Sequence, residues 1–127
     1  MRKKILLFAL LMVVVAAQAQ LRPNMAYQTY INQYKDLAIE QMKRYRIPAS
    51  ITMAQGLLES RAGLSELARQ SNNHFGIKCH GWTGATVYAD DDATQECFRA
   101  YATVFDSYED HSKFLSQQPR YRSLFVL

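Results

Sequence analysis

The chain has 127 residues, enough for one domain, of which 49% are hydrophobic and 20% are charged. This composition excludes an intrinsically disordered chain and a collagen-like repeat. The formal net charge is +4, but three of the 15 basic residues lie at positions 2–4. The other 12 basic residues and the 11 acidic residues nearly balance, so the sequence predicts no binding to nucleic acid.

Residues 1–19 have the pattern of a secretory signal peptide. Basic residues at 2–4 precede an apolar run over 5–16, and Ala17-Gln18-Ala19 fits a cleavage site before Gln20. The apolar run is about 12 residues long, whereas a membrane-spanning helix needs about 20, so a membrane anchor is the less favoured alternative. We expect an exported domain, periplasmic or extracellular, with no stable membrane insertion after signal cleavage.

Export changes how the two cysteines are interpreted. In an oxidising compartment, Cys79 and Cys97 are expected to form a disulfide, which would stabilise the fold by roughly 3 kcal/mol. Two alternatives are a zinc site that also uses His74 and His80, and a cysteine nucleophile paired with His80 or His111. No C-x-x-C pair is present, so the zinc site is disfavoured.

Three helices are predicted in the first half of the mature chain. Apolar residues at steps of three and four predict an amphipathic helix over 25–46. Pro48 ends it and suits the first turn of a second helix, over 48–60. This second segment is apolar nearly all round, so we expect it to be buried. A short third helix is predicted over 64–70.

The second half predicts a small β-hairpin followed by helices. Residues 85–89 and 95–101 are strand-like, and the aspartates at 90–92 are expected to form the turn between them. Ser107, with Asp110 three residues later, resembles a capping box that opens a helix to about Leu115. Another helix is expected over 121–127. The fold class is therefore α+β and mainly helical.

Glu59 is the residue whose position suggests chemistry. It lies at the end of the apolar 48–60 segment, where burial and the negative end of the helix dipole would both favour a protonated carboxyl. Such a group can act as a general acid on a glycosidic oxygen. Alternatively, Glu59 reaches solvent or pairs with Arg61. Gln55, four residues earlier on the same helix face, is a candidate hydrogen-bond partner for its carboxyl.

Several motifs surround Glu59 in a fixed order. Residues 56–65 read GLLESRAGLS, 72–78 read NNHFGIK, 81–84 read GWTG and 97–101 read CFRAY. This series resembles the glucosaminidase domain of glycoside hydrolase family 73, also described as mannosyl-glycoprotein endo-β-N-acetylglucosaminidase-like. The resemblance extends from about Tyr30 to the last residue.

The resemblance implies a fold, a substrate and a catalytic residue. It implies a lysozyme-like helical core with a β-hairpin lobe across a cleft. It also implies cleavage of the β-1,4 bond between N-acetylglucosamine and N-acetylmuramic acid in peptidoglycan, with Glu59 as the catalytic acid. No metal and no cofactor are expected, and the protein is expected to be a monomer whose partner is the glycan strand. A lytic transglycosylase, a non-catalytic peptidoglycan-binding remnant and a cysteine amidase remain alternatives.

A second carboxylate is expected on the hairpin lobe. Asp90 and Asp91 are favoured, and Glu96 is the next candidate, although the aspartates could instead form a solvated turn. Retaining, inverting and substrate-assisted mechanisms all stay open, because the separation of the two carboxyls decides between them.

Sugar faces pack on aromatic rings, so the remaining candidates are aromatic or amide side chains. We expect binding roles, or else ordinary core roles, for Asn73, Phe75, Trp82, Tyr88 and Tyr101. His111 is expected to be exposed at a polar helix start. In relatives the segment after Pro119 continues into further helix, so the domain over 20–127 is expected to be C-terminally truncated.

Overall fold

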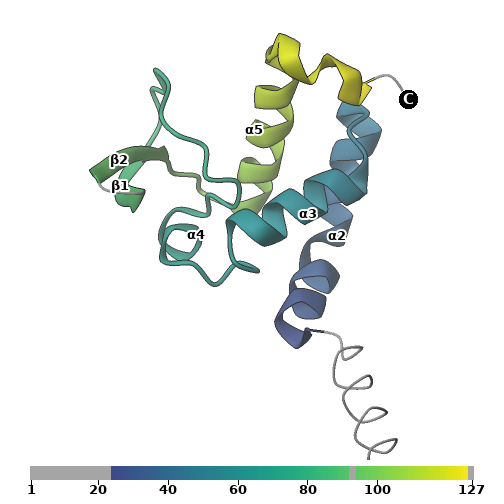
Figure 1. The fold of residues 1–127 in the computed structure, drawn as a ribbon, viewed down its shortest axis with the longest axis horizontal. Helices are drawn as coiled ribbons and strands as arrows, with labels where there is room; N and C mark the ends of the chain where they lie inside the picture. Colours follow the sequence, from purple (N-terminus) through teal and green to yellow (C-terminus); the bar gives the residue numbers. More distant parts are fainter. Residues whose placement is uncertain (1–23, 92–93, 126–127) are drawn as a thin grey trace, which may run out of the picture.

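The computed structural model describes residues 24–91 and 94–125 (Figure 1). The predicted signal peptide and its cleavage site lie outside these residues. In chain order the elements are α2 (Met25–Tyr45), α3 (Ala49–Glu59), α4 (Glu66–Ser71), β1 (Thr86–Asp91), β2 (Thr94–Arg99), α5 (Val104–Gln117) and the 3₁₀ helix η1 (Pro119–Phe125). No helix among the described residues is long and apolar enough to cross a membrane.

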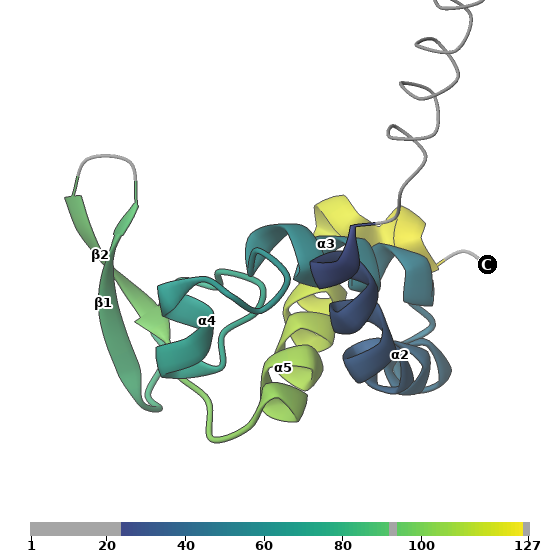
Figure 2. The same ribbon diagram turned by 90° about the horizontal axis from the view of Figure 1, so that it is seen from below.

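Helices α2, α3 and α5 form one packed group, and the hairpin projects from it as a separate lobe. Helix α2 packs against both α3 and α5, while α4 lies between this group and the hairpin (Figure 2). The largest buried cluster joins Ala38 of α2, Phe75 and Ile77 of the loop after α4, and Tyr108 of α5. The predicted α+β class, with a helical core and a β-hairpin lobe, is confirmed.

Local sequence explains where the first helices begin and end. The Asn24 side chain accepts a hydrogen bond from the Tyr27 backbone N–H at 3.2 Å and caps α2. Arg46 takes a left-handed conformation with φ of 61° and ends α2, and Pro48 then precedes α3. The predicted bounds of both helices are therefore correct within about one residue.

The expectation that α3 is buried on all sides is wrong. Only the face carrying Thr52, Gly56 and Leu57 is buried, while Leu58 is 66% exposed. The helix rests on α2 along this one face, where Gly56 also approaches the Tyr108 hydroxyl of α5, and its opposite face lies at the surface. An apolar segment of this length can therefore contribute both to a core and to an exposed wall.

The two strands lie closer to the tip of the hairpin than predicted: β1 continues to Asp91, two residues past its predicted end, and β2 ends at Arg99, two residues before its predicted end. β1 and β2 pair antiparallel, with Tyr88 opposite Cys97 and Asp90 opposite Gln95. Strand β1 continues through Asp91, so Asp90 and Asp91 are strand residues and the prediction that they form the turn is wrong. Asp92 lies outside the described residues.

A disulfide fastens the hairpin to the preceding loop. Cys79 and Cys97 are bonded, with their Cα atoms 5.5 Å apart, and the Cys79 backbone N–H donates to the Cys97 carbonyl at 3.0 Å. The predicted disulfide is confirmed. Because both sulfurs are used in this bond, the zinc site and the cysteine nucleophile are excluded as interpretations of these residues.

The start of α5 differs from the prediction. Thr103 caps the helix, its side chain accepting from the Asp106 backbone N–H at 3.1 Å, and Ser107 lies inside the helix. Ser107 is fully buried, and its hydroxyl accepts a hydrogen bond from the His74 backbone N–H at 3.1 Å. Ser107, which the sequence predicted as the helix cap, instead binds the loop after α4. Where a helix was predicted over 121–127, the chain forms a 3₁₀ helix over Pro119–Phe125, and the last two residues lie outside the described ones.

A buried polar chain crosses the helical core. The Tyr30 hydroxyl lies 2.8 Å from His74 Nδ1 and 2.8 Å from the Tyr108 hydroxyl. Burial raises the pKa of both tyrosines and lowers the pKa of His74 to about 4, so all three groups are neutral at pH 7. These hydrogen bonds join α2, α5 and the loop after α4, and none of the three side chains carries a charge.

Replacing Gly56 with alanine is predicted to destabilise the protein. A Cβ at this position would lie 2.8 Å from the Tyr30 hydroxyl and 3.0 Å from the Tyr108 hydroxyl. Overlap of this kind costs about 1–3 kcal/mol and exceeds the roughly 1 kcal/mol gained in helix propensity. Urea denaturation should show a lower free energy of unfolding, whereas Ser50→Ala on the exposed face of α3 should change it by less than about 0.5 kcal/mol. A Gly56→Ala protein more stable than wild type would contradict this packing.

Acidification is predicted to destabilise the fold through His74. The unfolded chain takes up a proton at this residue near its ordinary pKa of 6.5, whereas the folded chain does so only near pH 4. The free energy of unfolding should therefore fall as the pH drops through this window, by up to about 3 kcal/mol from this residue. His74→Gln removes the proton uptake, so its stability curve measured by urea denaturation between pH 7 and pH 4 should be flatter than that of wild type. Parallel curves for the two proteins would contradict the assignment.

Candidate active site

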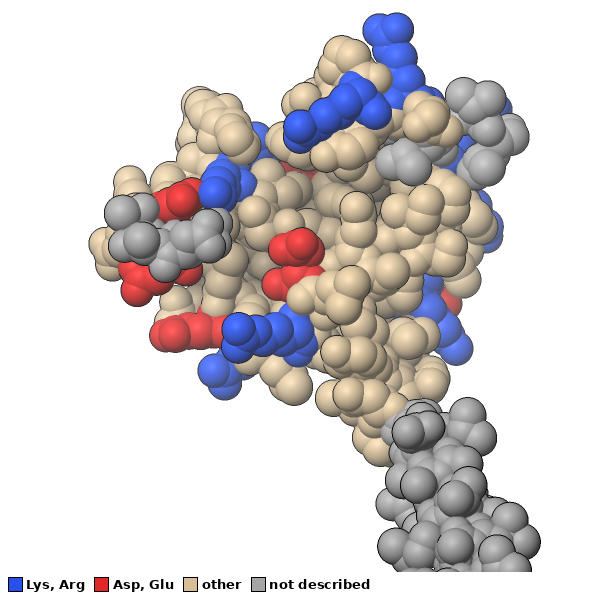
Figure 3. Space-filling view, viewed as in Figure 1, with Lys and Arg blue, Asp and Glu red and all other residues tan. Residues whose placement is uncertain are grey.

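Glu59 is the last residue of α3, and its side chain is exposed at the surface. The prediction that it is buried is therefore wrong. It lies instead at the junction of two hollows, because it lines both of them. Figure 3 shows acidic side chains in the middle of this face, between the hairpin lobe and the helices.

The first hollow lies on the helical side of Glu59. It has a volume of about 240 Å³ and is formed by α3, α5, η1 and the loop before the hairpin. Its walls combine polar and aromatic groups, among them Gln55, Phe75, His111, Phe114 and Tyr121. Phe75, a predicted sugar-binding residue, is only 8% exposed and contributes to this wall from the core.

The second hollow runs from Glu59 to the hairpin. Its volume is about 540 Å³, and its lining includes Arg61, Glu66, Tyr88, Asp90 and Gln95. Tyr88 is 66% exposed and is one of the residues that line this groove. Tyr88 and Asp90 are two residues apart on β1, the spacing that puts side chains on the same face of a strand.

The candidates for the second carboxylate differ in their surroundings. Asp90 is exposed and shares the larger groove with Glu59. The Asp91 backbone pairs with Thr94, but its side chain lies outside what the structure describes. Glu96 forms an ion pair with Lys78 at 2.6 Å. Of these three, Asp90 is the residue that the structure brings to the same groove as Glu59.

Two glycines and a left-handed turn shape the backbone beside Glu59. Arg61, Ala62 and Gly63 have φ values of 51°, 57° and 76°, which turn the chain back after α3. Gly76 has a φ of 64°, and a Cβ there would lie 3.5 Å from Glu59 Oε2. The FGIK loop therefore approaches the carboxylate through its backbone, a contact that the sequence interpretation missed although it had singled out the motif.

The Asn73 side chain is buried and makes its hydrogen bonds within the protein. It is 2% exposed, and its amide nitrogen donates to the carbonyls of Ile77 and Arg99, each at 2.9 Å. Its Oδ1 accepts from the Ile77 backbone N–H at 3.1 Å. Because the amide is fully occupied, Asn73 shapes the loop behind the site and has no donor left for a ligand.

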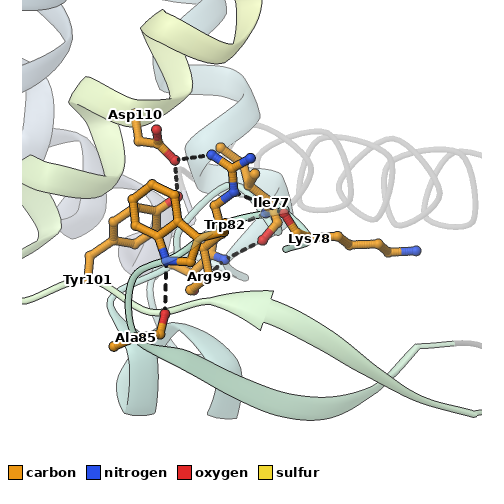
Figure 4. A network of polar contacts seen from close by, with 8 residues as sticks. Ile77, Lys78, Trp82, Ala85, Arg99, Tyr101 and Asp110 are labelled. Atoms are coloured by element: carbon orange, nitrogen blue, oxygen red, sulfur yellow. Dashed lines mark hydrogen bonds and ion pairs between the residues drawn. The ribbon is translucent and has the colours of Figure 1, made fainter. Parts of the chain in front are cut away.

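Trp82 and Tyr101 also lie away from Glu59, in a network that joins the hairpin to α5 (Figure 4). The Arg99 guanidinium lies 4.8 Å from the Trp82 ring centroid and 3.0 Å from Asp110 Oδ2, and the Tyr101 hydroxyl donates to the same carboxylate. The indole N–H donates to the Ala85 carbonyl at 3.0 Å. Both rings line a different hollow, of about 430 Å³, so the structure does not bring them to either Glu59 groove.

His111 differs most from its sequence prediction. It is only 5% exposed rather than exposed, and its ring stacks on Phe75 with centroids 3.8 Å apart. Its Nε2 lies 2.9 Å from Gln55 Oε1, so Gln55 is paired with His111 and not with Glu59. Sequence reasoning missed this pair because the contact joins residues of α3 and α5 that are 56 positions apart.

Comparison with known proteins places the chain in a family. Residues 35–126 match the glucosaminidase family, described as mannosyl-glycoprotein endo-beta-N-acetylglucosaminidase, and the chain belongs to it. The chain is 35% identical over 94 residues to exo-glucosaminidase LytG of Bacillus subtilis (strain 168), an alignment covering 68% of this chain and 33% of LytG. It is 30% identical over 108 residues to peptidoglycan hydrolase FlgJ of Vibrio parahaemolyticus, covering 76% of this chain and 35% of FlgJ. The chain thus spans about a third of the length of these relatives.

Solved structures have the same fold. The catalytic domain of the Listeria monocytogenes autolysin Auto superposes with a TM-score of 0.63 and 31% identity, over 85% of this chain and 67% of that one. The glycoside hydrolase domain of Salmonella typhimurium FlgJ gives a TM-score of 0.68 at 22% identity, over 80% and 67% of the two chains.

Proposed function

We propose that this domain hydrolyses peptidoglycan by cleaving the β-1,4 bond between N-acetylglucosamine and N-acetylmuramic acid. The observation that supports this most strongly is the position of Glu59 where the two hollows meet. A glycan strand laid along both hollows would pass directly over its carboxyl group. Glu59 would then act as the general acid that protonates the leaving glycosidic oxygen.

Asp90 is the proposed second carboxylate. It reaches the groove from the hairpin, whereas Glu59 reaches it from the helical core, so a sugar bound between them would be flanked by both groups. One carboxyl would donate the proton and the other would activate water or attack the sugar. Tyr88, exposed beside Asp90, would support the flat face of a sugar ring.

The proposed setting is outside the cytoplasm. Peptidoglycan glycan strands are the proposed partner, and the disulfide between Cys79 and Cys97 suits an oxidising compartment. The predicted signal peptide over 1–19 belongs to the same proposal, as does action by a monomer without nucleic acid. Glycosidase chemistry with two carboxyls requires no cofactor.

Removing the acid of Glu59 is predicted to abolish hydrolysis. Glu59→Gln keeps the shape of the side chain, but its amide is not acidic enough to transfer a proton to the leaving oxygen, so release of reducing ends from purified peptidoglycan should fall by about 10²–10⁴-fold. Binding to sedimented peptidoglycan should remain near the wild-type level. The matched control is Glu40→Gln, an exposed carboxylate of α2 that lines neither hollow, which should keep full activity.

Mass spectrometry of the released fragments decides between the alternatives. Hydrolysis between the two sugars gives fragments with reducing-end N-acetylglucosamine. A 1,6-anhydro product, lighter by one water, would replace this proposal with a lytic transglycosylase. Binding without any fragment release by wild type would replace it with a non-catalytic peptidoglycan-binding domain.

Asp90→Asn is predicted to lower kcat on peptidoglycan by about 100-fold, because the amide can neither take up a proton nor attack the sugar. Asp36→Asn, an exposed position of α2, is the matched control and should leave kcat unchanged. Initial rates at saturating substrate measure the effect. A near-normal rate for Asp90→Asn together with a large loss for Glu96→Gln would transfer this role to Glu96.

A further inference from the structure

His111 is held as a neutral ring beside the smaller hollow. Its side chain is 5% exposed and stacks almost parallel on Phe75, with 13° between the ring planes. Burial lowers its pKa to about 4, against a smaller opposing effect of the Asp110 carboxylate. At neutral pH one ring nitrogen therefore carries a hydrogen and the other does not.

The hydrogen bond to Gln55 selects the nitrogen that carries this hydrogen. Nε2 lies 2.9 Å from Gln55 Oε1, and an amide oxygen can only accept, so Nε2 is the donor. Nδ1 is buried and has no partner within residues 24–91 and 94–125, which suits a bare nitrogen better than an N–H group, because buried N–H groups are almost always satisfied. Both observations favour the same tautomer.

This contact fixes which way the Gln55 amide faces. With Oε1 turned toward His111, the NH₂ group is turned away from it, and among the described residues no protein acceptor pairs with it. Gln55 is exposed and lies four residues before Glu59 on α3, so both side chains are on the same side of the helix. Both line the 240 Å³ hollow.

The rest of this hollow supplies apolar surface. Phe75, Phe114 and Leu115 line it together with Gln55. An oriented N–H donor beside apolar walls matches an acetamido group, which presents a carbonyl oxygen and a methyl group. Sugars of the proposed substrate carry this group, so the inference rests on the proposed function.

We propose that Gln55 donates a hydrogen bond to the acetamido carbonyl of the sugar bound next to Glu59, and that His111 is the positioning residue that orients it. Gln55 is thus a specificity-determining residue for N-acetylated sugars. His111 does not touch the substrate and acts only through Gln55.

Nuclear magnetic resonance tests the proposal without requiring turnover. In the Glu59→Gln protein, tetra-N-acetylchitotetraose should shift the side-chain NH₂ resonances of Gln55. The same tetramer without acetyl groups should not, and the exposed amide of Gln28 on α2 is the internal control. Long-range ¹H–¹⁵N spectra should show His111 protonated at Nε2 at pH 7. Protonation at Nδ1, or equal Gln55 shifts with both tetramers or with neither, would overturn the proposal.

Two substitutions of His111 distinguish the effect of its N–H donor from the effect of its ring packing. His111→Phe keeps a ring against Phe75 but removes the donor, whereas His111→Gln keeps an N–H near the position of Nε2. On peptidoglycan, His111→Phe should lower kcat/KM by about tenfold, mainly through KM, and His111→Gln should restore most of it. Equal losses in both variants, with unchanged Gln55 shifts, would assign His111 a purely structural role. A wild-type protein that releases no fragments would refute the proposed function, while the Gln55 shifts would still decide the role of this pair.

Discussion

The last turn of α3 rests on two buried tyrosine hydroxyls. Because Gly56 has no side chain, the hydroxyls of Tyr30 and Tyr108 pack directly against the helix backbone. Beneath the helix, the Tyr30 hydroxyl is also hydrogen-bonded to His74. This contact fixes the height and rotation of α3 over the core. Gln55 and Glu59 are therefore presented to the surface by a rigid helix end and not by a mobile loop.

The opposite wall of the larger groove is fixed by separate contacts. The Cys79–Cys97 disulfide joins the hairpin to the loop before it, and Arg99 ties β2 to Asp110 of α5 while covering the Trp82 ring. The partly buried ion pair acts at Arg99, the last residue of β2, and the covalent bond acts two residues earlier, at Cys97. They hold the hairpin against the helical core, so that Tyr88 and Asp90 face the same groove as Glu59.

Local patterns in the sequence predicted where most helices and strands lie, to within a few residues. They did not predict which side chains of these elements are exposed. Helix periodicity and Pro48 placed α2 and α3, and two strand-like segments on either side of an aspartate run placed the hairpin, because these signals act within a few residues. The exposure of Glu59 and the burial of His111 depend on which faces of α3 and α5 meet, and no local pattern records that. Aromatic character alone likewise did not distinguish Tyr88, which lines the groove, from Tyr101, which is engaged with Asp110.

The position of Glu59 between the two hollows is the basis of this account. A crystal structure of the Glu59→Gln protein with a bound peptidoglycan fragment tests it most directly. The account predicts sugars on both sides of residue 59, with the side-chain amide within about 3 Å of a glycosidic oxygen. A fragment bound instead beside Trp82, in the hollow that Glu59 does not line, would contradict it.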